Sequence, residues 1–152
     1  MNLVKVKQEF YDLCKEHNVA DELLFNEAGR PCVLIVKLKY KGEARDFVVP
    51  LRSNISPMAP KNQYFSLPPN ANTKSKHHHG IHYIKIFPIH KSYIDKYVVE
   101  GNAYYTNILS IMNKKEALII KSCQEYLDEC AKGNKHSMTP NIDGIIEVLG
   151  LK

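Results

Sequence analysis

Apolar residues recur at helical spacing near the N-terminus. Leu3, Val6, Phe10 and Cys14 are separated by three or four positions within residues 2–17. This spacing places side chains on one face of an α-helix, and the side chain of Asn2 suits a helix cap. The pattern therefore predicts an amphipathic helix over residues 2–17.

A second helical stripe occupies the C-terminal third. Its apolar positions are Tyr105, Ile108, Leu109, Met112, Ile119, Ile120, Cys123, Leu127 and Cys130. Residues 113–116 interrupt the stripe and predict a bend, and Gly133 is a plausible stop. Thr139 and Pro140 resemble a cap and a first helical residue, so we expect a last helix running to about Leu149.

Between these helices the pattern changes to that of strands. Residues 31–40 are mostly apolar and end in an alternation with lysines, Gly42 supplies a turn, and residues 45–51 form a return strand. This order predicts a β-hairpin. Pro50 cannot donate to a ladder, so we expect it at the end or edge of a sheet, with residues 52–54 at the start of a loop.

Residues 54–80 form an irregular segment that contains four prolines. We expect a short strand over 63–67 and a polar loop over 70–76, and loops of this length are often functional. A histidine-rich strand is expected over 77–89, followed by a short strand or turn over 92–96. In that strand, Ile81, Tyr83 and Lys85 should share one face, opposite His82, Ile84 and Ile86.

A helix, several antiparallel strands and further helices, in that order, predict an α+β fold. The 152 residues, 44% hydrophobic and 24% charged, fit one domain over residues 1–152. The sequence has no bilayer-length apolar run and no signal peptide, so we expect a cytoplasmic protein with no membrane partner. The cysteines lack Cys-x-x-Cys spacing and are expected to be reduced and buried, namely Cys14, Cys32, Cys123 and Cys130.

The net charge of +5 is unevenly distributed. Residues 30–97 contain 12 Lys and Arg against 3 Asp and Glu, whereas residues 1–29 contain 3 against 6 and residues 98–152 contain 6 against 7. A basic centre between mildly acidic ends is typical of a protein that meets a polyanion with one face. The alternative is a solvated basic surface with no partner.

Residues 52–54 bring three anion-binding groups together after an apolar strand. Arg52 offers a fork of cationic donors, Ser53 a hydroxyl and Asn54 an amide. The alternative is a hairpin exit in which Ser and Asn serve only the turn.

The histidines of residues 77–82 allow two interpretations. His79 and His82 could share a metal ion, but no carboxylate or cysteine nearby completes a ligand set, so no metal site is expected. Alternatively, His79 and His82 are general acid–base groups, or plain surface histidines. Glycine-rich phosphate loops, Gly-x-Ser-x-Gly elbows, His-Glu-x-x-His motifs and paired carboxylates are absent from the sequence.

The remaining groups suit metal-free chemistry on RNA, which carries its own 2′-hydroxyl nucleophile. Arg52, Ser53 and Lys85 can orient that hydroxyl and relieve charge at phosphorus. We expect RNA contacts from Asn54, Lys61, Tyr64, Lys74, Lys76, Lys37 and Lys39, with base stacking on Tyr64, Phe65 and Tyr83 unless these aromatics are core residues. A non-catalytic RNA-binding module and a metal-dependent nuclease are the alternatives.

With these residues in view, most of the chain, roughly residues 3–150, resembles the toxins of type III toxin–antitoxin systems, the ToxN/AbiQ family. The resemblance is closest to the branch typified by CptN. It rests on a strand ending in Val49-Pro50-Leu51-x-Ser53, on Gly80-Ile-x-x-x-Lys85 leading into Pro88-Ile89, and on Thr139-x-Asn141 before a short helix.

The resemblance implies a twisted antiparallel sheet or open barrel like that of MazF and Kid toxins, wrapped by helices. It implies a metal-independent endoribonuclease, with no cofactor, that leaves 2′,3′-cyclic phosphate and 5′-hydroxyl ends on cellular or phage RNA. The implied inhibitor is a small pseudoknot antitoxin RNA, cut from a repeat transcript and bound in a closed toxin–RNA hetero-oligomer.

Family residues can be carried over at a few positions. Ser53 matches the active-site serine and Lys85 the lysine of the Gly-x-x-x-x-Lys segment. Arg52 stands where other members have threonine, and Ile55 stands where ToxN has a lysine. Arg52, Lys61 or Lys85 would therefore supply the missing cation, while the histidines of 77–82 lie outside the family pattern.

Overall fold

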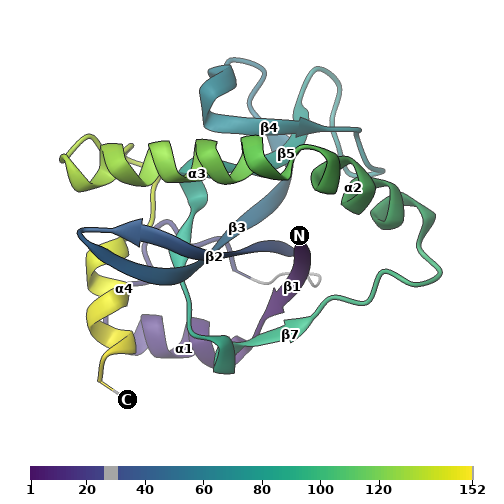
Figure 1. Ribbon diagram of the computed structural model, residues 1–152. Coiled ribbons are helices and arrows are strands. Elements are labelled where there is room, and N and C mark those ends of the chain that lie inside the picture. Colours follow the sequence, from purple (N-terminus) through teal and green to yellow (C-terminus); the bar gives the residue numbers. More distant parts are fainter. Residues whose placement is uncertain (26–30, 152) are drawn as a thin grey trace.

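An open antiparallel sheet forms the centre of the computed structural model, which describes residues 1–25 and 31–151 except the side chain of Val36. The strand order is β4-β5-β3-β2-β1-β7, with β6 also paired to β3 (Figure 1). The strands are β1 (Asn2–Val6), β2 (Cys32–Tyr40), β3 (Glu43–Ile55), β4 (Tyr64–Leu67), β5 (His78–His82), β6 (Phe87–Pro88) and β7 (Ile94–Lys96). The helices are α1 (Gln8–Glu16), α2 (Ala103–Lys114), α3 (Glu116–Ala131) and α4 (Ile142–Leu149).

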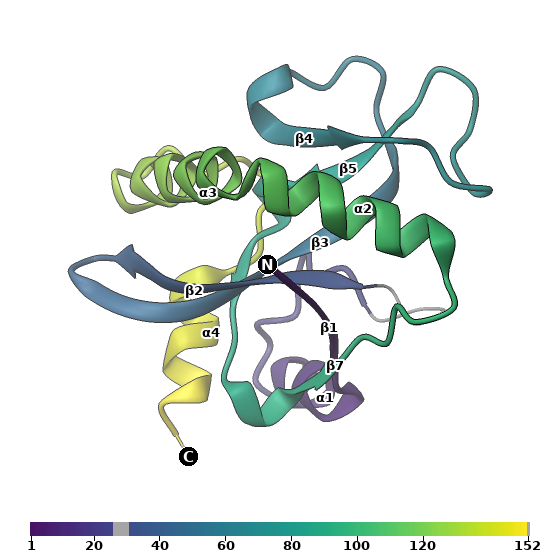
Figure 2. The ribbon, with the colours of Figure 1, turned by 45° about the vertical axis from the view of Figure 1, so that its right-hand side comes forward.

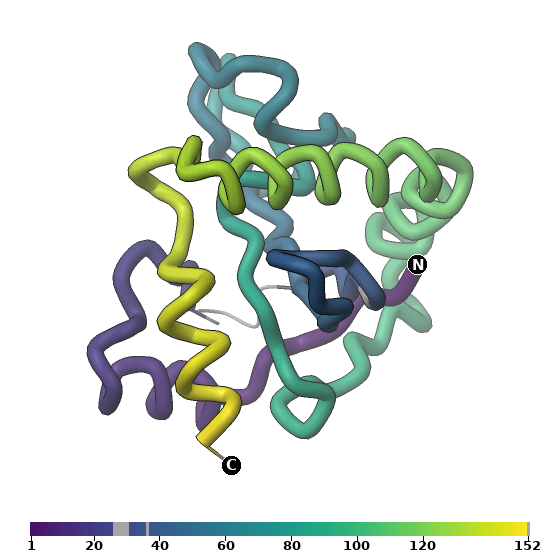
Figure 3. Tube along the Cα trace, turned by 60° about the vertical axis from the view of Figure 1, so that its left-hand side comes forward, coloured from purple at the N-terminus to yellow at the C-terminus, as the bar shows by residue number. Residues whose placement is uncertain are grey.

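Helices cover both faces of this sheet. Side chains of α2 and α3 pack with one set of strand residues, which includes Val33 and Val49. Side chains of α1 and α4 pack with the alternate set, which includes Cys32 and Val48. Figures 1 and 3 show α3 on one side of the sheet and α1 beside α4 on the other. The predicted α+β fold, an antiparallel sheet wrapped by helices, is confirmed.

The prediction of one helix over 2–17 is wrong in its first half. Residues 2–6 form β1, which pairs with β2 and with β7, and the helix begins only at Gln8. Leu3, Val4 and Val6 are buried, and the branched side chains of the two valines favour an extended backbone. Asn2 consequently lies in a strand and caps no helix.

The predicted hairpin is confirmed, but its second strand is longer than expected. β3 continues to Ile55, so residues 52–54 lie in a strand and not at the start of a loop. Pro50 also lies inside β3. It is tolerated there because β3 pairs with β6 at Phe47 and Val48 and with β5 only from Leu51 onward, so Pro50 falls between the two partners.

The predicted strand over 77–89 is interrupted. β5 ends at His82, residues 83–85 form a 3₁₀ turn, and β6 follows at Phe87. The expected face shared by Ile81, Tyr83 and Lys85 is therefore wrong beyond His82. The short strand predicted over 63–67 is confirmed as β4, and the expected segment at 92–96 contains β7.

The helical C-terminal third is confirmed, with a break at Lys115 between α2 and α3. Gly133 has a φ of 89°, a conformation that suits glycine after a helix. The predicted start at Thr139 and Pro140 is two residues early, because the side chain of Asn141 accepts the N–H of Gly144 and caps α4. The described residues contain no helix long and apolar enough to cross a membrane.

All four cysteines are free and buried, as predicted. Burial raises the pKa of Cys14 and that of Cys123 to about 12. These thiols are packed as small apolar side chains and carry no thiolate at neutral pH.

Candidate functional site

Residues 52–54 lie in the part of β3 that pairs with β5. Leu51 pairs with Ile81 and Arg52 with Gly80, and the register then shifts before Ile55 pairs with His78. Such a shift is the mark of a β-bulge, which redirects side chains and is common beside functional sites. Figure 2 shows that the segments joining β3 to β4 and β4 to β5 extend from this same end of the sheet.

Arg52, His82 and Lys85 form a group that we call the cationic cluster after its two charged members, Arg52 and Lys85, although Lys85 lies beyond the end of β5. The guanidinium Nη1 of Arg52 lies 3.4 Å from Nδ1 of His82. His82 and Lys85 are each only 3% exposed. Burial, followed by the charges of Arg52, Lys85 and His136, lowers the pKa of His82 to about 4. His82 is therefore neutral at physiological pH.

The hydrogen-bonding state of His82 follows from its neighbour. A guanidinium can only donate, so the Nδ1 atom that faces Arg52 accepts and the proton of neutral His82 is on Nε2. Within the described residues, Nε2 is buried and has no hydrogen-bond partner. Buried N–H groups are almost always paired, so an Nε2–H with no partner among the described residues is unusual and marks His82 as a candidate ligand-binding group.

Lys85 is held by Glu22. Its ammonium Nζ donates to the backbone carbonyl of Glu22 at 3.2 Å and lies 3.6 Å from the carboxylate Oε2 of the same residue. Burial lowers the pKa of Lys85, the Glu22 carboxylate opposes that effect, and Arg52 adds to it. Glu22 itself has a φ of 65°, which is rarely found outside glycine and asparagine.

Ser53 and Asn54 hold the loop that follows β4. Oγ of Ser53 accepts a hydrogen bond of 2.9 Å from Nδ2 of Asn70. The amide of Asn54 donates to the carbonyl of Asn72 at 3.0 Å and accepts the N–H of Lys74 at 2.7 Å. Both side chains therefore position the polar segment 70–74, and the Ser53 hydroxyl proton can still be given to an acceptor.

His79 belongs to a different contact from His82. It is 3% exposed, and its Nδ1 donates to the carbonyl of Pro68 at 2.9 Å. The hydroxyl of Tyr104, from α2, donates to the same carbonyl at 2.5 Å and lies 2.6 Å from Nδ1. Burial lowers the pKa of His79, and its hydrogen bond to Pro68 opposes the shift. Neither His79 nor His82 is a surface histidine.

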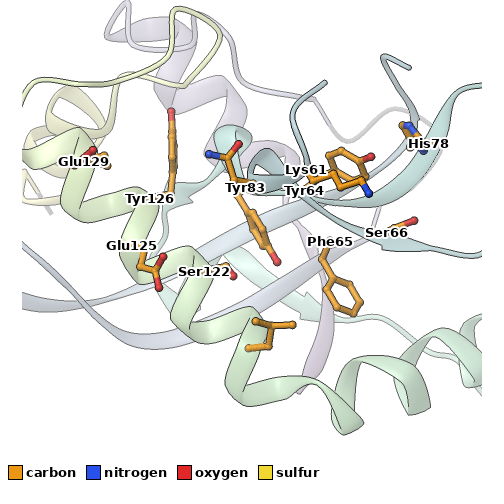
Figure 4. A pocket seen from close by; sticks show the side chains of 12 residues that line it. Lys61, Tyr64, Phe65, Ser66, His78, Tyr83, Ser122, Glu125, Tyr126 and Glu129 are labelled. Carbon is orange, nitrogen blue, oxygen red and sulfur yellow. The ribbon is translucent and has the colours of Figure 1, made fainter. Parts of the chain in front are cut away.

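A cleft of about 670 Å³ separates β4 from α3. Figure 4 shows Tyr83 between α3, which carries Ser122 and Glu125, and the strand that carries Tyr64 and Phe65. Lys61 lies on the β4 side of the cleft. Tyr64 and Tyr83 are buried, at 8% and 4% exposed, so both are core aromatics that also form cleft walls.

The remaining predicted RNA contacts are scattered. Lys37 and Lys39 are exposed on β2, where the backbone N–H of Lys39 donates to Gln124 of α3. Lys74 and Lys76 are exposed on the loop before β5. The structure therefore brings Arg52, His82 and Lys85 together, but it does not gather the predicted lysines at one point.

Sequence reasoning did not identify four neighbours of the site. They are Asn70 beside Ser53, Tyr104 beside His79, Glu22 beside Lys85, and His136, whose charge acts on His82. Three come from segments distant in sequence, and nothing in the local pattern marks them. The described residues contain no group of three or more His, Cys, Asp and Glu placed to hold a metal ion.

Comparison with known proteins gives matches in structure alone. No family model and no curated protein matches the sequence. One similar solved structure belongs to a study of bacterial type III toxin–antitoxin systems in which a non-coding RNA pseudoknot selectively inhibits the toxin. It has a TM-score of 0.69 and 14% identity, over 96% of this chain and 94% of that one.

A second similar structure belongs to a bacterial antiviral system regulated by a processed non-coding RNA. Its TM-score is 0.66 at 14% identity, over 97% of this chain and 96% of that chain. Both alignments span nearly the whole of each chain, so the likeness is one of complete architecture. This chain has the fold of the proteins in these two RNA-regulated bacterial systems.

Proposed function

We propose that this protein is the toxin of a type III toxin–antitoxin system of the ToxN/AbiQ kind. Its activity is metal-independent, sequence-specific cleavage of single-stranded RNA, leaving 2′,3′-cyclic phosphate and 5′-hydroxyl ends. The shared fold of the two RNA-regulated bacterial systems and the basic middle of the sequence support this assignment.

The observation that carries the proposal is the buried Nε2–H of His82, which has no acceptor in the described chain and lies beside two cations. A donor of this kind next to Arg52 and Lys85 suits a phosphate oxygen.

Each group then has a chemical task. The 2′-hydroxyl attacks the adjacent phosphorus and gives up its proton, the P–O5′ bond breaks, and the 5′ oxygen takes a proton. Ser53 orients the 2′-hydroxyl or the scissile phosphate, while Arg52 and Lys85 neutralise the charge that grows at phosphorus. His82 donates to the phosphate or exchanges the proton, with His79 as the second candidate.

The partner RNAs follow from the same assignment. The protein acts in the cytoplasm on cellular or phage RNA. It also processes a small pseudoknot RNA, and this RNA inhibits the protein. Toxin and antitoxin RNA form a closed hetero-oligomer, with Lys61, Lys74 and Lys76 among the phosphate contacts.

The test is incubation of the pure protein with single-stranded RNA in excess chelator, followed by analysis of the product ends. Wild type is expected to cleave and leave cyclic phosphates, whereas Ser53→Ala loses about 100-fold in rate because it no longer positions the reacting groups. Ser110→Ala, an exposed serine on α2, is the matched control and should retain full activity.

A non-catalytic RNA-binding module is the second candidate, and it is favoured by the burial of Lys85 and His79. It predicts tight, salt-sensitive binding that leaves the RNA intact. Full cleavage by Ser53→Ala would instead place the active site elsewhere, and cleavage abolished by chelator would make the protein a metal-dependent nuclease.

A further inference from the structure

The cleft between β4 and α3 lies beside the cationic cluster but is distinct from it. Tyr64 lines the cleft and pairs across the strands with His82, which belongs to the cluster. The ring of Tyr64 stacks on that of His78, with centroids 5.0 Å apart and planes at 25°. Gly80 lies between His78 and His82 on the same face of β5 and has no side chain to separate the rings of these two histidines. Across the sheet, Gly80 pairs with Arg52 of β3.

The walls of the cleft suit a flat, unsaturated ring. Tyr64, Phe65 and Tyr126 present aromatic surface, and the buried Tyr83 shares a hydrogen bond with Ser122. Stacking on aromatic side chains is the common way in which proteins hold the unstacked bases of single-stranded RNA. The cleft volume of about 670 Å³ lies within the range of small-molecule sites.

Charge is divided across the cleft. The positive charge of Lys61 lies on the β4 side, whereas Glu125 and Glu129 lie one turn apart on α3. Among the described residues, the ion pairs of these glutamates are with exposed lysines, at 3.9 Å from Glu125 to Lys121 on α3 and at 3.4 Å from Glu129 to Lys132 just after it. The carboxylates repel phosphate, so an RNA backbone must run along the basic side and direct a base toward α3.

A carboxylate at the end of a base cleft discriminates by hydrogen bonding. Carboxylate oxygens only accept, and adenine, cytosine and guanine each offer an exocyclic amino group. Where cytosine carries its amino group, uracil presents a carbonyl oxygen that a carboxylate repels, so the ring N3–H is the one donor uracil can offer on that edge. The acidic side of the cleft therefore favours bases that carry an amino group over uracil.

We propose that this cleft binds an unstacked, amino-bearing nucleobase of an RNA strand whose neighbouring phosphate lies at Arg52, with Glu125 or Glu129 as the residue that determines base preference. The proposal rests on the proposed function, since it assigns a base site to the same RNA substrate. It adds a specificity determinant that neither the basic residues nor the fold supplies.

The test is equilibrium binding of short oligonucleotides that each contain one kind of base, measured by fluorescence anisotropy. The probes carry 2′-O-methyl groups, which remove the nucleophile and prevent cleavage. Wild type is expected to bind the adenine and cytosine probes about tenfold more tightly than the uracil probe. In Glu125→Gln or Glu129→Gln that ratio should fall about fivefold, because a glutamine amide can also donate to the carbonyl of uracil.

The control is Glu100→Gln, which makes the same charge change at an exposed residue outside the cleft and should keep the wild-type ratio. An unchanged ratio in both cleft variants, or no base preference in wild type, overturns the base site while cleavage of RNA continues. Absence of both RNA binding and RNA cleavage in wild type overturns the proposed function itself.

Discussion

His82 combines burial, a neighbouring guanidinium and a ring N–H with no acceptor among the described residues. The unpaired ring N–H destabilises the fold, because a buried polar group without a partner costs about 1–3 kcal/mol. A residue of this kind is kept where it serves a ligand, which is why His82 has the strongest claim among the candidate groups.

Stability should therefore depend on acid through His82. Its pKa is about 4 in the folded protein and 6.5 when unperturbed, so the unfolded chain binds the proton first. The contribution of neutral His82 to the free energy of unfolding is complete above pH 6.5. It is lost as the pH falls toward 4, which lowers the free energy of unfolding by about 3 kcal/mol. Urea unfolding across this range should show the loss, and His82→Gln should show a smaller one.

The exposed His90 supplies the comparison for that experiment. His90→Gln should follow the wild-type pH profile. If His82→Gln follows it equally well, the acid sensitivity originates in other groups, of which His79 is the first to examine.

The pairing of β4 with β5 holds the candidate site together, and it depends on Gly80. A Cβ atom at Gly80 would lie 2.1 Å from the backbone oxygen of Phe65, much closer than real contacts allow. Because the clash is with backbone, the two strands would have to separate. Tyr64, His78 and Arg52 would then lose their common support.

Gly80→Ala is accordingly expected to destabilise the protein by about 1–3 kcal/mol and to reduce RNA cleavage. Hydrogen exchange should locate the loss of protection in β4 and β5. Gly150→Ala, where the nearest atom would be 3.4 Å away, should stay within about 0.5 kcal/mol of wild type. Equal effects of the two substitutions would mean that the strand contact is not responsible.

Local pattern predicted those elements whose neighbours in space are neighbours in sequence. The hairpin was predictable because Gly42 and its turn lie between the two strands, and the bend in the C-terminal helices because polar residues interrupt the stripe. β1 was not predictable, because Leu3 and Val6 fit a helix equally well and only the pairing with β2 and β7 makes this segment a strand. Likewise, Arg52 was identified but not its contact with His82.

Basic and acidic residues lie in different parts of the fold. The basic residues 30–97 include β2 to β7, whereas the more acidic C-terminal third supplies α2, α3 and α4. α3 therefore brings Glu125 and Glu129 against a sheet whose own residues are basic. A polyanion is attracted to the basic side of the cleft and repelled from the acidic side. This difference orients the bound polyanion along the basic side.

RNA affinity should accordingly fall steeply with salt. For single-stranded RNA the slope of log K against log salt concentration is about −0.7 per phosphate contact. Lys61→Ala should reduce the steepness by about that amount without changing base preference, as measured by anisotropy titrations at several salt concentrations. Lys114→Ala, on α2, should leave the slope unchanged. An unaltered slope for Lys61→Ala would exclude this lysine from the phosphate path.

The four buried thiols have a practical consequence. Because none is exposed and the pKa values of Cys14 and Cys123 are far above neutrality, maleimide reagents find no reactive sulfur in the native chain. A single cysteine introduced at an exposed cleft position such as Ser66 would carry a fluorophore or spin label without prior removal of native cysteines. The arrival of RNA at the cleft could then be followed directly in the otherwise unaltered protein.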